Sequence, residues 1–180
     1  MTRSNKSANV FLEDMVALLP RLWRFALAQC RQKDLAEDLV QQTCQRALER
    51  RLQFEPGTRL DHWMFAILAS LWKNHLRSEK IRRGLGSVDA NDLWDDGQIT
   101  KADEAIMHSQ LLRAVLELPQ WQRELVTLVY VEQMSYKEAA FVLDIPLGTV
   151  MSRLASAKTT LAARLHGADH QQSAGRFYHE

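Results

Sequence analysis

The sequence has few of the residues on which disulfide-rich and membrane-spanning proteins depend. Only two of its 180 residues are cysteines, Cys30 and Cys44. That number is too small for a disulfide framework and fits a reducing compartment. No window approaches the run of about 18 apolar residues that a membrane-spanning helix needs, and the polar start lacks the apolar segment of a signal peptide. We therefore expect a cytoplasmic protein that does not insert into membranes.

The sequence also lacks the patterns of catalytic and metal-binding sites. None of the six histidines pairs with cysteines or carboxylates at the spacing of a zinc site. His166 and His170 are four residues apart, but they lie at the expected end of a helix. No serine or cysteine sits in a nucleophile elbow, no glycine-rich phosphate loop is present, and a helix N-terminus accounts for the acidic cluster at Asp34, Glu37 and Asp38. We expect neither an enzyme nor a protein that requires a cofactor or metal.

The charges nearly cancel, but they are segregated along the chain. There are 23 lysines and arginines against 22 aspartates and glutamates, for a net charge of +1. One segment is basic: Lys73, Arg77, Lys80, Arg82 and Arg83. The next is acidic: Asp89, Asp92, Asp95, Asp96, Asp103 and Glu104. A near-neutral total can therefore hide a basic nucleic-acid patch beside an acidic linker.

Apolar spacing predicts an all-α protein of two small helical domains, without alternating strands. The expected helices cover residues 10–31, interrupted or kinked at Pro20, and then 34–51, 61–83, 104–118, 120–132, 136–143 and 148–165, after a frayed polar start at 1–9. Glycines and aspartates in residues 84–103 indicate a flexible linker. The predicted organisation is a domain at 10–83, the linker at 84–103, a second domain at 104–166 and a disordered polar tail at 167–180.

The helix predicted at 34–51 has two unlike faces. Its core face consists of Leu39, Val40, Cys44, Ala47 and Leu48. The opposite strip is rich in amides: Asp38, Gln41, Gln42 and Gln45. Such a strip is suited to docking on a protein partner, and the pattern alone equally allows a merely solvated face.

The helix predicted from Asp61, which can cap it, changes character along its length. Its first half is apolar, whereas its second half is basic and carries Trp72, Asn74 and His75 among the cations. Cations neutralise phosphates and flat rings stack on exposed bases, so this mixture suits melted nucleic acid. The alternative is that the aromatic residues belong to the core. We expect that role for Trp63, and the pattern leaves Trp72 open.

The stretch from Ser135 to Leu165 has the pattern of a helix-turn-helix. A first helix at 136–143 precedes a turn at 144–147, where Pro146 has a suitable φ, and a second helix starts near Gly148. The second helix has an apolar stripe of Val150, Leu154, Ala157 and Leu161. Its other side is short, polar and lightly basic: Thr149, Ser152, Arg153, Ser156 and Thr160. This pattern favours a helix that enters the DNA major groove over a plain helical hairpin.

Several motifs in order resemble bacterial sigma factors of the extracytoplasmic-function (ECF) group. They are LPRLWRFA, DLAEDLVQQTCQRAL, FEPGTRLDHWMFAIL, LWKNHLR and LPQWQRELVTLVYVEQMSYKEAAFVLDIPLGTVMSRL, and together they span about residues 10–166. Members of that family have two domains, sigma2 and sigma4, joined by a linker. The resemblance implies a subunit that directs RNA polymerase core to promoters, associates with the nucleoid when active and is held by an anti-sigma protein.

The resemblance also implies roles for individual residues. The amide-rich strip at 38–45 matches the segment that binds the clamp helices of the polymerase β′ subunit, and the family also contacts the β flap. The loop and helix after residue 54 match the part that opens the −10 element, at Phe54, Ser70, Lys73, Asn74, Arg77, Lys80 and Arg83. The −35 element would be read by Thr149, Ser152, Arg153 and Ser156.

This sequence departs from the usual family pattern at some of these positions. Members often carry an acid at Gln42, asparagine at Ser70, glycine at Asp144 and arginine near Met151 or Ser156. The bases that this protein prefers in its promoters therefore cannot be inferred from the family. Two alternatives remain: a sigma-like adaptor that binds an anti-sigma protein without reading promoters, and a regulator that binds duplex DNA without polymerase. The intact basic run argues against the first, and the sigma2-like half against the second.

Overall fold

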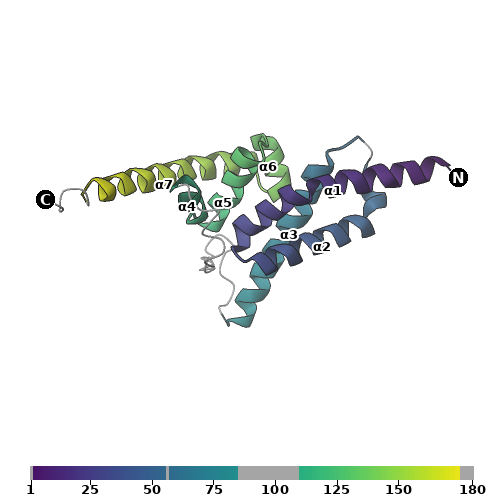
Figure 1. Ribbon diagram of the computed structural model, residues 1–180, viewed down its shortest axis with the longest axis horizontal. Helices are drawn as coiled ribbons and strands as arrows, with labels where there is room; N and C mark the ends of the chain where they lie inside the picture. The colour runs from purple at the N-terminus through teal and green to yellow at the C-terminus, as the bar shows by residue number, and fades with distance from the viewer. Residues whose placement is uncertain (1, 56, 85–109, 175–180) are drawn as a thin grey trace.

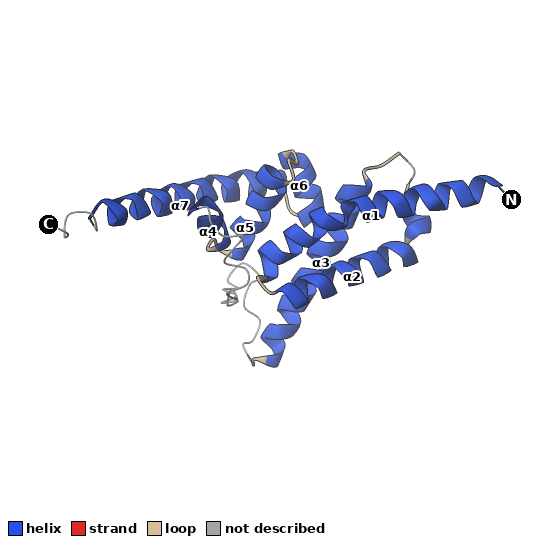
Figure 2. Ribbon diagram, in the orientation of Figure 1, coloured by secondary structure: helices blue, strands red, loops and turns tan. Residues whose placement is uncertain are grey.

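The computed structural model describes residues 2–55, 57–84 and 110–174, and every regular element among them is helical (Figure 2). The N-terminal part contains α1 (Thr2–Cys30), α2 (Lys33–Glu49), the short 3₁₀ turn η1 (Arg51–Gln53) and α3 (Leu60–Arg82). The C-terminal part contains α4 (Gln110–Leu116), α5 (Gln120–Val126), the π-helical turn η4 (Thr127–Val131), α6 (Tyr136–Leu143) and α7 (Leu147–Ala174). The predicted all-α class is confirmed. The predicted linker beyond Gly84 and the start of the helix predicted at 104 lie outside the described residues.

The first helix is longer than the sequence predicted. α1 begins at Thr2 and runs through Pro20 as one element, so the predicted frayed start is wrong, and of the two alternatives at Pro20, two helices or a kink, the first is wrong. Proline removes one backbone donor, which orphans the carbonyl of Val16. Because Val16 and Pro20 are both exposed, water can hydrate that carbonyl, and the helix continues at little cost.

A three-helix bundle forms the first hydrophobic core. Phe25 of α1 packs edge-on against Phe65 of α3, with ring centroids 5.4 Å apart. Leu39 and Ala47 of α2 are buried as predicted, but Leu48 is 40% exposed. Leu48 lies in the last turn of α2, which ends at Glu49, whereas the successive residues Leu39 and Val40 are both buried in the middle of the helix.

The C-terminal part contains the predicted helix-turn-helix. A capping box starts α6: the Glu138 N–H donates to Ser135 Oγ (3.3 Å), and the Ser135 N–H donates to Glu138 Oε2 (2.7 Å). Asp144 ends α6 in the left-handed conformation, with φ 52° and ψ 55°. The apolar stripe of α7 is buried at Val150, Leu154 and Ala157. The helix continues to Ala174, so the predicted end near residue 165 is wrong.

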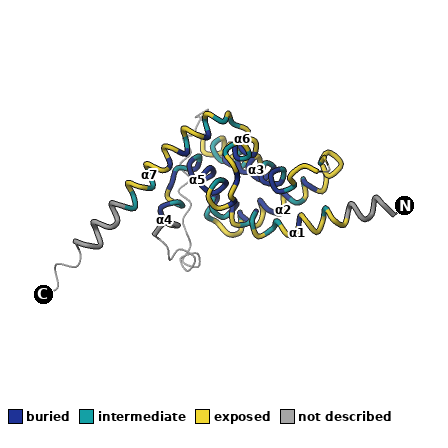
Figure 3. The backbone as a smooth tube through the Cα atoms, turned by 90° about the horizontal axis from the view of Figure 1, so that it is seen from above, coloured by how far each residue is buried: buried dark blue, intermediate teal, exposed yellow. Residues whose placement is uncertain are grey.

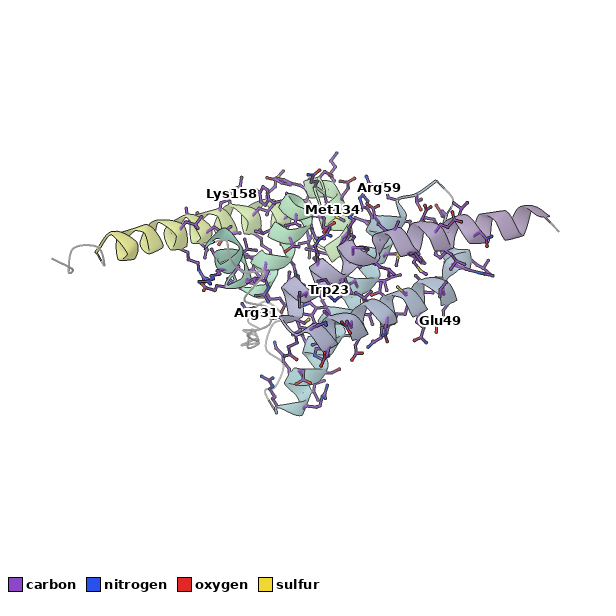
Figure 4. All side chains as sticks on the ribbon, in the orientation of Figure 1. Trp23, Arg31, Glu49, Arg59, Met134 and Lys158 are labelled. Carbon is purple, nitrogen blue, oxygen red and sulfur yellow. The ribbon has the colours of Figure 1, made fainter. Side chains whose placement is uncertain are left out.

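The two parts pack directly against each other, which the sequence did not predict. α6 lies against α3, and α5 lies against α1 (Figures 1 and 3). Arg21 Nε donates to Glu132 Oε2 (2.7 Å), and Arg123 Nη2 donates to the Gln29 carbonyl (3.0 Å). Arg31 donates to the Leu116 carbonyl at the same junction (Figure 4). Polar and charged contacts therefore cross the interface, beside a hydrophobic core that is continuous between the two parts.

No single helix within the described ranges is long and apolar enough to cross a membrane. α6 and the part of α7 up to Leu165 meet those criteria only when they are taken together, and they are bent by 106°.

Candidate nucleic-acid interface

The basic half of α3 presents part of the predicted −10 set along one edge. Ser70, Asn74 and Arg77 are exposed and follow a helical i, i+4, i+7 stripe. Arg77 Nη1 lies 3.5 Å from Asn74 Oδ1. Lys80 is half-buried, and Arg83 is exposed at the helix end, where Glu79 lies 3.7 Å from its Nε. This edge of α3 combines cations and an amide that can contact phosphates and bases.

Lys73 belongs to the same predicted set but lies in the domain interface. Its ammonium donates to the carbonyl of Leu143 at the C-terminal end of α6. A cation is favourable there because the last carbonyls of a helix carry partial negative charge. In this arrangement Lys73 stabilises the contact between α3 and α6, and the side chain is half-buried.

The aromatic residues near the basic edge divide into core and surface groups. Trp72 is 1% exposed and stacks on His75, with ring centroids 5.5 Å apart. The possibility that Trp72 stacks on nucleic-acid bases is therefore excluded in this arrangement. Phe54 is half-buried against Trp63 (5.3 Å between centroids) and Phe11 (5.9 Å). These contacts anchor the start of the loop that precedes α3.

Asp61 does not cap α3 as predicted, because Arg59 occupies the N-cap position. The carboxylate of Asp61 instead accepts hydrogen bonds from Arg59 Nη2 (2.8 Å) and Arg21 Nη1 (3.3 Å). Burial alone raises the pKa of Asp61, but the hydrogen bond from Arg59, the charge and backbone N–H of His62 and the charge of Arg59 together lower it to about 2.

This network continues into the C-terminal part. Arg59 Nη1 lies 3.3 Å, and His62 Nε2 3.4 Å, from Glu138 Oε1. Arg59 lies near the upper outline of the molecule in Figure 4. The start of α3 is thus tied to both α1 and α6.

The recognition helix α7 displays the predicted −35 residues in two ways. Ser152 and Ser156 are exposed, whereas Thr149 and Arg153 are half-buried. The Arg153 guanidinium lies over the Trp121 ring, 5.5 Å from its centroid. These side chains therefore lie along one flank of α7, between its buried stripe and solvent.

Helix α5, which the sequence did not assign to a site, supports that flank. Gln122 is buried, and its Nε2 donates to Ser156 Oγ (3.1 Å) and Thr160 Oγ1 (3.4 Å). These contacts join residues more than 30 positions apart, so no periodicity in the sequence signals them. The buried Glu124 lies on the same helix. Burial raises the pKa of the Glu124 carboxyl. A hydrogen bond from Gln120 and the positive charges of Lys73, Arg123 and Arg153 lower it, but burial is the larger effect.

The amide-rich strip of α2 is solvent-exposed, at Asp38, Gln41, Gln42 and Gln45. Beside it lies an open groove of about 640 Å³, lined on the α1 side by Leu19, Pro20 and Trp23 and on the α2 side by Val40 and Gln41. Gln41 belongs to both the strip and the groove, so an amide surface adjoins an apolar one. The sequence pattern indicated the strip but not the groove.

The two cysteines are free thiols, with Cys30 buried and Cys44 half-buried. No group of three or more histidine, cysteine or acidic side chains within the described ranges is placed to hold a metal ion. Cys30 is buried and its Sγ lies 3.1 Å from the Gln32 carbonyl. Burial raises the pKa of the Cys44 thiol, which disfavours the reactive thiolate.

Comparisons with known proteins match both halves of the chain. Residues 15–82 match the family described as Sigma-70 region 2, and residues 108–161 match Sigma-70, region 4. The ECF RNA polymerase sigma factor EcfG of Rhodopseudomonas palustris is 35% identical over 155 residues, which cover 86% of this chain and 84% of EcfG. SigM of Bacillus subtilis, also an ECF sigma factor, is 27% identical over 79% of this chain and 86% of SigM.

Solved structures show the same architecture. The sigma factor RpoE of Bartonella quintana, in complex with the anti-sigma factor NepR, superposes with a TM-score of 0.68 at 28% identity, covering 87% of this chain and 96% of that one. CnrH, in complex with the cytosolic domain of CnrY, gives a TM-score of 0.63 at 22% identity over 89% of this chain and 90% of CnrH, a likeness of fold. Sigma factors are initiation factors without a catalytic site of their own. With both sigma-70 regions in order on one helical chain, this protein belongs to the ECF group of RNA polymerase sigma factors.

Proposed function

We propose that this chain directs RNA polymerase core to promoters that it reads at two separate DNA elements, for a stress or envelope response. The observation that carries the proposal is the pairing of a basic α3 edge with a polar recognition helix on one sigma-family chain. The α3 edge would hold the melted −10 element, and α7 would read the −35 element as duplex. The domain boundaries at 10–83 and 104–166 remain part of this proposal.

The −10 assignment rests on the charge and shape of α3 and its preceding loop. Removing a base from the stack costs a few kcal/mol, and a stacking contact returns roughly 1–3 kcal/mol. Phe54 is anchored on Trp63 and Phe11, so the loop is held at the start of α3 before DNA arrives. Arg77 and Asn74 then follow along the same edge and can contact the strand backbone.

Lys73 imposes a condition on this proposal. Its ammonium is engaged by the Leu143 carbonyl, so it can reach DNA only if α3 and α6 separate. Separation also suits the distance to be covered, because the two promoter elements lie more than one helical turn, about 34 Å, apart. We therefore expect the domains to open when the protein engages polymerase and promoter.

The polymerase contacts are assigned to the α2 strip and its neighbouring groove. Asp38, Gln41, Gln42 and Gln45 would contact the β′ clamp helices, and the C-terminal domain would contact the β flap. An anti-sigma protein is the expected regulator, since the sigma factor in the Bartonella structure is bound by one. Activity would take place at the nucleoid, in the cytoplasm.

Transcription in vitro tests the function directly. The purified chain would be added to bacterial core polymerase with fragmented genomic DNA, and the transcript starts would be sequenced. Discrete starts that share two upstream elements are the expected result. Stable core binding without starts would point to a missing activator or promoter. If neither starts nor core binding is observed, the sigma-like adaptor becomes the better explanation.

A further inference from the structure

Helix α5 contacts two of the residues assigned to −35 recognition. Trp121 lies beneath the guanidinium of Arg153, at 5.5 Å from carbon to ring centroid. The next residue, Gln122, donates from Nε2 to Ser156 Oγ at 3.1 Å. Both contacts come from one turn of α5 and reach one flank of α7.

The two α5 side chains that make these contacts differ in burial, so they restrain their partners in different ways. Gln122 is 3% exposed, so its amide is held by the packing around it and cannot follow a moving hydroxyl. Trp121 is half-buried, which leaves its ring as a fixed platform at the protein surface. The face of an indole ring attracts a cation placed over it, so Trp121 restrains the position of the Arg153 guanidinium. The N–H groups of a guanidinium are the part of arginine that contacts guanine O6 and N7 in the major groove.

We propose that Trp121 and Gln122 are positioning residues for −35 recognition, which fix the side chains of Arg153 and Ser156 before DNA binds. The inference rests on the proposed function and adds specificity-determining residues that do not themselves touch DNA. Trp121 orients the guanidinium fork toward a guanine. Gln122 occupies one acceptor site of the Ser156 hydroxyl and leaves the hydroxyl hydrogen to donate to a base or phosphate acceptor.

Pre-organisation predicts an effect on base preference as well as on affinity. An arginine without its platform samples more rotamers and contacts phosphates and several bases in turn. The bidentate contact with guanine then loses its advantage over other contacts. Loss of Trp121 should therefore flatten the preference at one −35 position, which a general loss of domain stability would not do.

A double-mutant cycle in reconstituted holoenzyme tests the inference. The full-length wild type, Trp121→Leu, Arg153→Ala and the double variant would each be combined with core polymerase. Promoter binding would be measured against a library with a randomised −35 element. We expect Trp121→Leu to weaken binding by about threefold to tenfold and to flatten guanine preference. In the Arg153→Ala background the same change should have little further effect.

Conservative and matched variants separate positioning from folding. Trp121→Phe keeps an aromatic face and should retain most of the preference. Tyr130→Leu removes another aromatic side chain of the same domain, which is 49% exposed, and should leave the −35 profile unchanged. Gln122→Leu should likewise weaken binding in the wild type. It should have little effect in a Ser156→Ala, Thr160→Ala background, which removes both hydroxyls that the Gln122 amide contacts.

The outcomes are distinguishable. If Trp121→Leu weakens promoter binding equally in the wild-type and Arg153→Ala backgrounds, Trp121 supports the domain structure and does not position Arg153. That result would overturn the inference. A wild-type −35 profile in Arg153→Ala would also overturn it, since no reading residue would remain to be positioned. If the wild-type holoenzyme selects no promoter at all, the proposed function itself fails.

Discussion

Among single residues, Asp144 sets the geometry of the helix-turn-helix. It adopts φ 52° and ψ 55° at the end of α6, a conformation that glycine enters freely and that aspartate tolerates better than most residues. Because Asp144 is exposed, substitutions there test backbone conformation with little change in packing.

Asp144→Val should lower the free energy of unfolding by about 1–2 kcal/mol, because a β-branched side chain is strained in the left-handed region. Asp144→Gly should keep or raise it. Urea denaturation measures both. Lys137→Val, at an exposed helical position of α6, is the control and should cost only about 0.5 kcal/mol. Equal effects of valine at the two positions would contradict a left-handed Asp144.

Asp61 should make stability depend on acid pH. Its folded-state pKa of about 2 lies below the ordinary value of 3.8, so the folded state favours the carboxylate. Its contribution to the free energy of unfolding is therefore present above the ordinary pKa and is lost as the pH falls from 3.8 toward 2.

Comparison of the wild type with Asp61→Asn isolates this contribution. The wild type should be more stable at about pH 5, and its advantage should shrink by about pH 2.5. Asp38→Asn, an exposed aspartate outside the network, is the matched control and should show a much smaller change. A difference between wild type and Asp61→Asn that is independent of pH would contradict the assigned ion pairs.

Among the elements, α3 changes role along its length. Its first half is core, with Phe65 and Leu68 buried, whereas Asn74 and Arg77 are exposed in its second half. The first half of α3 therefore serves the core, and the second half adds the exposed basic edge that we propose binds DNA.

Arg77→Ala should weaken promoter binding by holoenzyme, because one phosphate contact is lost. The plot of log affinity against log salt concentration should become shallower by roughly 0.7–0.9. Lys33→Ala removes an exposed cation at the start of α2, paired with Glu37 at 3.9 Å, and should leave the slope unchanged. An unaltered slope in Arg77→Ala would place the −10 surface elsewhere.

In the whole molecule, the interface between the two domains buries polar groups beside the shared apolar core. Gln29 is 1% exposed there, and neither atom of its side-chain amide has a hydrogen-bond partner among the described residues. Each such buried group costs about 1–3 kcal/mol, and opening the interface would hydrate it. Charged contacts such as the ion pair of Arg21 with Glu132 stabilise the closed interface and offset this cost.

Arg21→Ala should shift the molecule toward separated domains. Glu132 has a side chain only 1% exposed, and Arg21 is its nearer partner at 2.7 Å, with Arg24 at 3.8 Å. Removing Arg21 therefore leaves the buried carboxylate with one weaker ion pair, at a cost below the roughly 3–5 kcal/mol of losing an only partner. Opening hydrates the carboxylate and avoids that cost. Small-angle scattering should therefore show a larger radius of gyration for Arg21→Ala, with Lys33→Ala unchanged. An unchanged radius would show that this ion pair does not control the domain contact.

The sequence by itself determined the helices, the helix-turn-helix and the family. Apolar spacing is a local property of the chain, so it predicted the buried stripe of Val150, Leu154 and Ala157. It left two helices or a kink open at Pro20, where α1 continues as one helix, because the tolerance of a proline depends on whether the orphaned carbonyl reaches water. The site residues inferred from the family remain predictions, although the structure shows which of them are accessible.

Only the tertiary structure decided the contacts between distant segments. It buried Trp72, moved Asp61 from a helix cap into an ion-pair network, and placed Lys73 at the end of α6. It also set Trp121 against Arg153. The physical reason is that these outcomes depend on which elements face one another across the core. The periodicity of a single helix determines which residues share a face, but it carries no information about what that face meets.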